Sequence, residues 1–182
     1  MDTVTAIILA LVVIVLIGAV AWMMMQRRTQ ELRRRFGPEY DRVITERGDT
    51  RQAEHELAAR QKRVEKFDIH PLDPAQRDGF IEAWRTTQAR FVDAPAEAIR
   101  DADRLVSEVM QARGYPVGDF EQRAADVSVD HPIVVENYRA ARAIALANER
   151  GQAGTEDLRQ AIVHYRALFE DLLETREREV AQ

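Results

Sequence analysis

The segment from Val4 to Met25 carries no charged residue and reads VTAIILALVVIVLIGAVAWMMM. At a rise of about 1.5 Å per residue, a helix of these 22 residues is about 33 Å long, close to the hydrocarbon thickness of a bilayer. A helix that is apolar on every face has no side suited to water, and a chain of 182 residues offers little core to hide it in. The segment therefore predicts a transmembrane helix over residues 4–25, preceded by a short tail of residues 1–3.

A cleaved signal peptide is the alternative interpretation of the same segment. Ala19-Val20-Ala21 supplies the small-x-small pattern of a cleavage site. However, the residues before the apolar run include no Lys or Arg, and the run continues past the triplet through Trp22 and three methionines. A signal peptide has a positive amino-terminal region and a shorter apolar core. These features favour a retained anchor, and an exported protein with a cleaved signal stays the alternative.

Arginines follow the apolar run at once, whereas none precedes it. Because arginine is costly to move across a bilayer, an arginine-rich flank stays in the cytoplasm. We therefore expect a single-pass protein of the cell membrane, with its N-terminus outside and its C-terminal domain in the cytoplasm. The same side chains are expected to contact anionic lipid head groups, each contributing on the order of 1 kcal/mol. They are Arg27, Arg28, Arg33, Arg34 and Arg35.

The rest of the chain predicts helices. Gly37-Pro38 forms a joint, because glycine suits the end of one helix and proline the first turn of the next. Two helices are expected at 38–47 and 51–67, the second narrow in its apolar stripe and capped by Asp49 or Thr50. With the arginine flank, they make a basic and charged helical connector over residues 26–71.

Residues 72–175 predict a small soluble bundle of about four or five helices, followed by a polar tail at 176–182. Four aspartates lie where helices are expected to begin. Three of them, Asp73, Asp93 and Asp130, come one or two residues before a proline, and Asp73 also begins a capping box. Apolar residues then recur at helical spacing, and no segment alternates as a strand would. The fold class predicted is all-α. The four expected start residues are Asp73, Asp93, Asp119 and Asp130.

Composition excludes several kinds of chemistry. The chain has no cysteine, which removes disulfides, thiolate nucleophiles and cysteine-ligated zinc. Its net charge of −5 argues against a nucleic-acid partner. His55-Glu56 begins a zinc-protease pattern, but Ala59 stands where the second histidine would be. Asp130-His131 is interpreted as a helix cap followed by a surface histidine. We therefore expect no enzymatic activity, catalytic residue, metal or cofactor.

Three stretches support a resemblance: LRRRFGPEYDR, RGYPVGDFEQRAADVSVDHPIVVENYRAA and TEDLRQAIVHYRALFEDLL. Over most of the chain after residue 31, the sequence resembles a family of short bacterial single-pass membrane or secreted proteins, with FGPEYDR and GYPVGDFEQRAADVSVDHP as its motifs. That family carries no assigned activity, so the resemblance transfers no functional residue. What it implies is a bacterial membrane-associated protein.

The absence of catalytic groups favours a protein-interaction or scaffolding module at the membrane, with an unidentified protein as its partner. The alternative is a bundle that binds a small ligand or a lipid. The sequence leaves the oligomeric state open. Tyr115, Phe120 and Tyr138 are the expected partner surface, and Trp84, Phe91 and Tyr165 are the residues expected near a ligand cavity.

Overall fold

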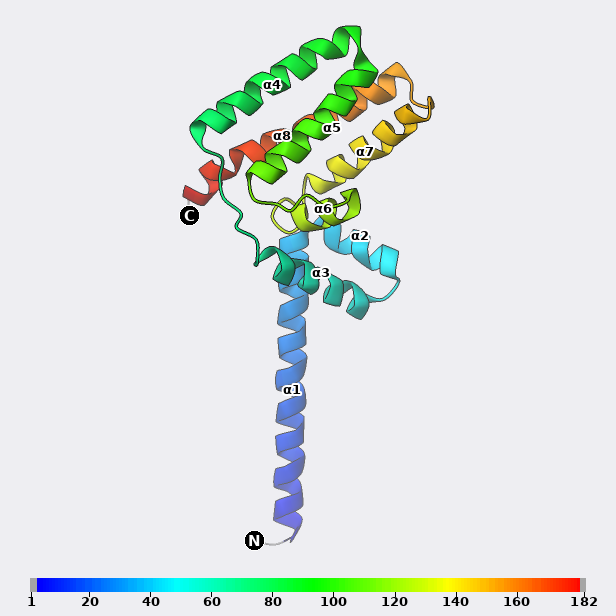
Figure 1. The fold of residues 1–182 in the computed structure, drawn as a ribbon. Coiled ribbons are helices and arrows are strands. Elements are labelled where there is room, and N and C mark those ends of the chain that lie inside the picture. The colour runs from blue at the N-terminus through cyan, green and yellow to red at the C-terminus, as the bar shows by residue number, and fades with distance from the viewer. Residues whose placement is uncertain (1–2, 181–182) are drawn as a thin grey trace. The chain divides into compact units, whose positions relative to one another are not determined.

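In the computed structural model, the backbone is described from residue 3 to residue 180 and the side chains from residue 11 to residue 173. Within these ranges every regular element is an α-helix and no strand occurs, which confirms the predicted all-α fold. Figure 1 shows the eight helices. They are α1 (Thr3–Phe36), α2 (Pro38–Arg47), α3 (Thr50–Val64), α4 (Pro74–Asp93), α5 (Pro95–Ala112), α6 (Phe120–Val127), α7 (Val135–Glu149) and α8 (Thr155–Val180).

The chain divides into two compact units, Met1–Leu57 and Ala58–Gln182. The sequence suggested that the second part begins at residue 72, fourteen residues further on. The difference has a local cause, because the second half of α3 and the loop after it bond to the bundle. The Arg63 guanidinium lies 3.0 Å from the Asp126 carboxylate, and the His70 backbone N–H donates to the Arg113 carbonyl at 3.0 Å.

Helix α1 is one continuous helix of 34 residues, about 51 Å long. It does not stop at the end of the apolar run but continues through the arginine flank. From Leu11 to Phe36 it is long and apolar enough to cross a membrane, judged by length and composition. Its large apolar side chains between Leu11 and Met25 are all exposed.

The joint predicted at Gly37-Pro38 is confirmed. Gly37 has φ +48°, the left-handed region in which a side chain would be strained, and α2 begins at Pro38. Helix α2 covers 38–47 as predicted, and the Asp49 carboxylate accepts the Gln52 N–H at 2.8 Å to start α3. Within Met1–Leu57, α2 packs against α1.

The second unit contains the helices α4 to α8, where a bundle of about four or five helices was expected from residue 72 onward (Figure 1). Helix α5 packs against α4, α7 and α8, while α7 packs against α5, α6 and α8. Helix α8 continues to Val180, through most of the segment predicted as a polar tail, and residues 181 and 182 lie outside the described residues.

Two of the four predicted helix starts are confirmed. Asp73 forms a full capping box with Gln76, and Asp119 accepts the Gln122 N–H. The other two are wrong. Asp93 is the last residue of α4, and the residue that caps α5 is Ala94, which has no side-chain hydrogen bond. Asp130 precedes a run of turns, and α7 begins only at Val135.

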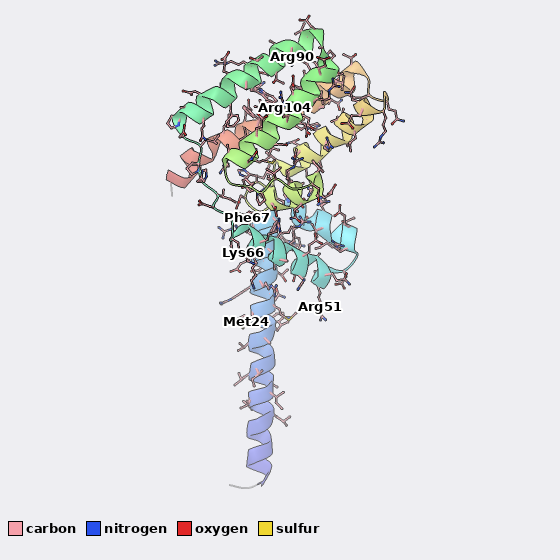
Figure 2. The ribbon with its side chains drawn as sticks, viewed as in Figure 1. Met24, Arg51, Lys66, Phe67, Arg90 and Arg104 are labelled. Atoms are coloured by element: carbon pink, nitrogen blue, oxygen red, sulfur yellow. The ribbon has the colours of Figure 1, made fainter. Side chains whose placement is uncertain are left out.

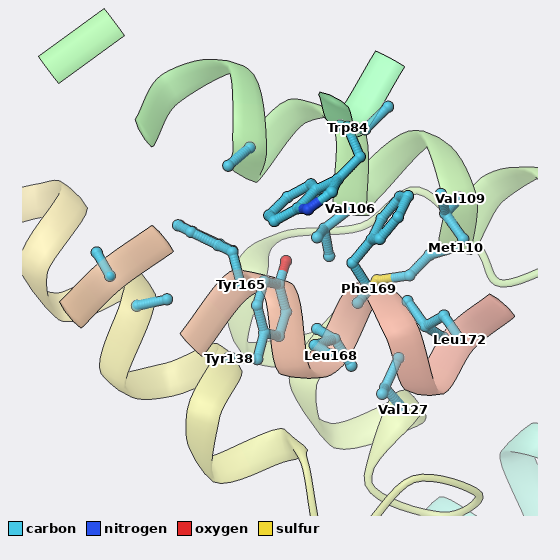
Figure 3. Close-up of a cluster of buried hydrophobic side chains, with 14 of the residues drawn as sticks. Trp84, Val106, Val109, Met110, Val127, Tyr138, Tyr165, Leu168, Phe169 and Leu172 are labelled. Carbon is cyan, nitrogen blue, oxygen red and sulfur yellow. The ribbon is translucent and has the colours of Figure 1, made fainter. Parts of the chain in front are cut away.

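The bundle core is formed chiefly by one face each of α5 and α8. On α8 the buried residues lie three or four positions apart, except for the adjacent Leu168 and Phe169, which places them on one side of the helix. Figure 3 shows Trp84 of α4 against Phe169 of α8, with the two rings stacked and their centroids 4.7 Å apart. The main core residues on α5 and α8 are Ile99, Ala102, Leu105, Val106, Val109, Met110, Leu158, Ala161, Tyr165, Leu168, Phe169 and Leu172.

Gly114 ends α5 as predicted, and its place admits no side chain. Its φ is +94°, and a Cβ atom there would lie 2.1 Å from the Asp68 carbonyl oxygen. The close approach lets the loop after α3 pass directly against the end of α5. This contact holds the connector loop on the bundle.

Candidate functional site: the basic flank and the buried polar groups

The five arginines predicted to face lipid head groups lie in the last three turns of α1, and all five are exposed. Leu32 and Phe36 are interleaved with them and are buried, at 5% and 0% exposure. The end of α1 is therefore amphipathic, with an arginine side and an apolar side. The Arg33 guanidinium also lies 5.2 Å from the centre of the Tyr40 ring, which joins the flank to α2.

Polar contacts order α2 and join it to α3. The Glu39 carboxylate is fully buried and accepts two hydrogen bonds, from Nε and Nη2 of Arg42, each at 2.9 Å. The Tyr40 hydroxyl donates to Glu54 of α3 at 2.9 Å. A bidentate arginine–carboxylate pair fixes geometry as well as charge. These contacts give the unit Met1–Leu57 a defined structure beyond α1.

The expected partner surface is wrong for two of its three residues. Tyr115 and Tyr138 are 3% and 0% exposed, and Phe120 is partly buried. Tyr138 packs between Phe120 and Tyr165, with ring centroids 4.7 and 6.4 Å away. Because this segment lacks a long helical pattern, the sequence did not indicate that its aromatic residues complete the bundle core.

Burial also changes the acidity of these tyrosines. Desolvation raises the pKa of Tyr138 to about 12, since a phenolate is costly away from water. Desolvation is also the main reason that the pKa values of Tyr115 and Tyr165 are raised. Their hydroxyls donate to Asp130 and Asp103, each at 2.9 Å, and these carboxylates raise the pKa further.

His131 is buried rather than on the surface, at 4% exposure, which corrects the sequence interpretation. Its Nδ1 lies 2.5 Å from the Asp171 carboxylate on α8, and its Nε2 lies 3.4 Å from Nη1 of Arg113. Both ring nitrogens of His131 therefore have a side-chain partner. The partner of the imidazole is thus a carboxylate forty residues away, while the adjacent Asp130 bonds to Tyr115.

This group of polar residues ties the irregular segment to the bundle. Nη1 of Arg113 also donates to the Leu172 carbonyl at 2.9 Å, so one guanidinium bridges the end of α5, His131 and α8. His131 is almost fully enclosed, and these contacts join the end of α5, the irregular segment and α8 through fixed hydrogen bonds.

A second polar contact joins α3 to α6. Asp126 is 1% exposed and accepts from Nε of Arg63 at 3.0 Å and from the Gln122 amide at 2.8 Å. Nearby, Arg60 donates to the Ser128 hydroxyl at 3.3 Å. A buried carboxylate left without such donors would be strongly unfavourable, so these contacts fix the second half of α3 on the bundle.

Two clefts lined by described residues are open to solvent, and neither of these two includes the residues proposed for a ligand cavity. One, of about 230 Å³, lies between α4 and α5, where Arg90 and Arg104 both pair with Asp101. The other, of about 390 Å³, lies at the turn between α2 and α3. Trp84 and Tyr165 are instead packed within the core. Among the described residues, no group of three or more His, Asp or Glu side chains has the arrangement of a metal site.

Sequence reasoning located the arginine flank but missed the buried polar residues. Arg113, His131 and Asp171 are far apart in the chain and come from three different segments, so no local spacing links them. Comparison with known proteins gave no match: no family model, no curated protein and no solved structure matches this chain. The predicted resemblance to a bacterial membrane-protein family therefore stays a prediction.

Proposed function

We propose that the protein is a membrane-anchored helical module that holds its bundle at the inner face of the cytoplasmic membrane. The observation that carries the proposal is the exposure of α1. Its large apolar side chains between residues 11 and 25 are between 45% and 68% exposed, which is unfavourable in water and favourable in lipid. The five exposed arginines follow directly.

The orientation follows from those arginines. Arg27 and Arg28 come within three residues of Met25, and no Lys or Arg precedes the apolar run. The positive-inside rule then puts the C-terminal side of α1 in the cytoplasm. The carboxyl end of a helix also favours cations, so Arg33, Arg34 and Arg35 suit the last turn of α1.

The continuity of α1 supports a retained anchor over a cleaved signal. The helix passes through Ala19-Val20-Ala21 without interruption and ends eleven residues after the apolar run, where Leu32 and Phe36 are buried. Cleavage after Ala21 would leave Trp22 and three methionines at a new terminus, still exposed. A folded arginine flank attached to the apolar run is what an anchor requires.

For the bundle we propose a scaffolding role with a protein partner. In the irregular segment the exposed apolar residues are Val117 and Ile133, at 67% and 75%, instead of the tyrosines. Each lies two or three residues from the Tyr115–Asp130 hydrogen bond, which holds the two loops beside each other. Site-specific photo-crosslinkers at these two positions, with Val163 as the exposed control on α8, test this part of the proposal. Equal crosslinking from all three positions would contradict it.

The anchor is tested by two measurements on the full chain. Reporter fusions at the C-terminus, one active only in the cytoplasm and one only outside it, are expected to give the cytoplasmic signal. The mass of the purified protein is expected to include residues 1–21. A soluble product that begins at Trp22 would overturn the anchor, and a reversed reporter pattern would overturn the orientation.

A further inference from the structure

The turn between α2 and α3 forms a cleft of about 390 Å³ lined by Arg47, Arg51, Gln52, His55 and Glu56. Four of these five side chains offer N–H donors, and two are permanent cations. Arg51 and His55 are one helical turn apart on α3 and both are exposed. The lining is therefore rich in the groups that bind phosphate oxygens.

The carboxylates around this cleft already have partners. Glu56 pairs with Arg47 at 2.5 Å, Asp49 accepts the Gln52 N–H, and Glu54 accepts from the Tyr40 hydroxyl. Arg51, by contrast, has no hydrogen-bond or ion-pair partner among the described side chains. One guanidinium at the cleft is thus left with all five of its donors available.

The level of Arg51 relative to α1 suggests which chemical group its guanidinium contacts. In Figure 2, Arg51 is drawn at the height of Met24, within the same compact unit. Met24 is the second-to-last residue of the apolar run. At the end of such a run, the hydrocarbon of a bilayer gives way to head groups. A cation at that level lies among lipid phosphates.

We propose that Arg51, with Gln52 and His55 beside it, binds the phosphate of an anionic phospholipid and thereby docks the α2–α3 turn on the membrane. The inference rests on the proposed anchor and extends it, because it gives the membrane-proximal unit a second attachment besides α1. Arginine suits the role since its planar guanidinium meets two phosphate oxygens at once. Free phosphate has the same chemistry, and the experiment separates the two sources.

The test places one nitroxide label at Thr50, next to Arg51, by Thr50→Cys. The label is unique because the chain has no cysteine. The full-length protein is reconstituted in nanodiscs of phosphatidylcholine, alone or mixed with phosphatidylglycerol, and access of a water-soluble nickel chelate is measured. Phosphatidylglycerol is expected to shield the label. Arg51→Gln is expected to lower the docked-to-free ratio about fivefold, as loss of one arginine near an anionic surface predicts.

Arg100→Gln is the matched control, because Arg100 is also an exposed arginine but lies on α5. It is expected to leave the shielding unchanged. Equal losses from Arg51→Gln and Arg100→Gln, or no shielding in phosphatidylglycerol, would overturn the lipid site. Inorganic phosphate that restricts the label equally in phosphatidylcholine alone would also overturn it, in favour of a free anion. A second label at Leu16 reports on the anchor: if it is open to the nickel chelate, the proposed anchor itself fails.

Discussion

The same kinds of apolar side chain have opposite surroundings in α1 and α8. Leu16 and Ile14 of α1 are 58% and 63% exposed, whereas Leu158 and Leu172 of α8 are 5% and 2% exposed. In α8, charged residues separate the apolar ones and define a water-facing side. In α1, no charge interrupts the run. The arrangement of polar residues, more than the apolar content, determines whether the apolar side chains of a helix can be buried against other helices or need an apolar solvent.

Arginine shows the same contrast. Arg27 and Arg28 are exposed at the end of the apolar run, while Arg113 in the bundle is 3% exposed and bonds to His131 and the Leu172 carbonyl. We propose that arginines of the first kind are attracted to anionic head groups, whereas Arg113 acts through fixed hydrogen bonds. A mutation in α1 and a mutation in the bundle should therefore have effects of different kinds.

The largest effect is expected in the bundle core. Phe169→Ala removes the ring that stacks on Trp84 and should lower the free energy of unfolding by about 3–5 kcal/mol. Denaturant unfolding followed by Trp84 fluorescence, in a Trp22→Phe background, measures it. Membrane retention should not change. Val163→Ala, at a position that is 52% exposed on the same helix, is the control and should cost little. Equal losses of stability from Phe169→Ala and Val163→Ala would show that the buried and exposed faces of α8 contribute equally to stability.

The corresponding change in α1 is Ile14→Arg. An arginine at the centre of a membrane span costs about 2.5–3.5 kcal/mol of insertion, so less protein should remain in membranes after alkaline extraction. The unfolding of the bundle should be unaffected, since Ile14 is in the other unit. Thr29→Arg, in the arginine flank, is the control and should keep full retention. Loss of bundle stability from Ile14→Arg would show that α1 and the bundle are not independent.

Sequence patterns located both regions because each depends on local information. An uninterrupted apolar run, Gly37-Pro38 and the Asp73 capping box each act within a few residues. The burial of His131 was not predictable in this way, because its partners Asp171 and Arg113 come close only in the folded bundle. The tyrosines were misplaced for the same reason: Tyr138 is on α7, and its neighbour Tyr165 is on α8.

Alkaline pH should destabilise the bundle through Tyr138. Burial raises the pKa of Tyr138 to about 12 from its ordinary value of 10.0, so the folded state keeps a proton that the unfolded state releases. The stability linked to this group is complete below pH 10 and is lost as the pH rises towards 12, by on the order of 2 kcal/mol.

Tyr138→Phe should flatten that part of the pH dependence, measured by denaturant unfolding on either side of pH 10. The membrane span contains no tyrosine, so retention in membranes should not follow the same curve. A variant with an unchanged alkaline slope would show that the burial of Tyr138 is not what links stability to pH.

The smallest effect compares two aspartates with nearly the same sequence context, DPAQ and DAPAE. Asp73 accepts the Gln76 N–H at 2.8 Å, so Asp73→Ala should lower the free energy of unfolding by about 1 kcal/mol. Asp93 ends α4 and caps nothing, because the intervening Ala94 takes the capping position. Asp93→Ala should then change the free energy by less than about 0.5 kcal/mol. Equal losses would mean that the proline, and not the cap, starts both helices, since Pro74 and Pro95 occupy the same first position.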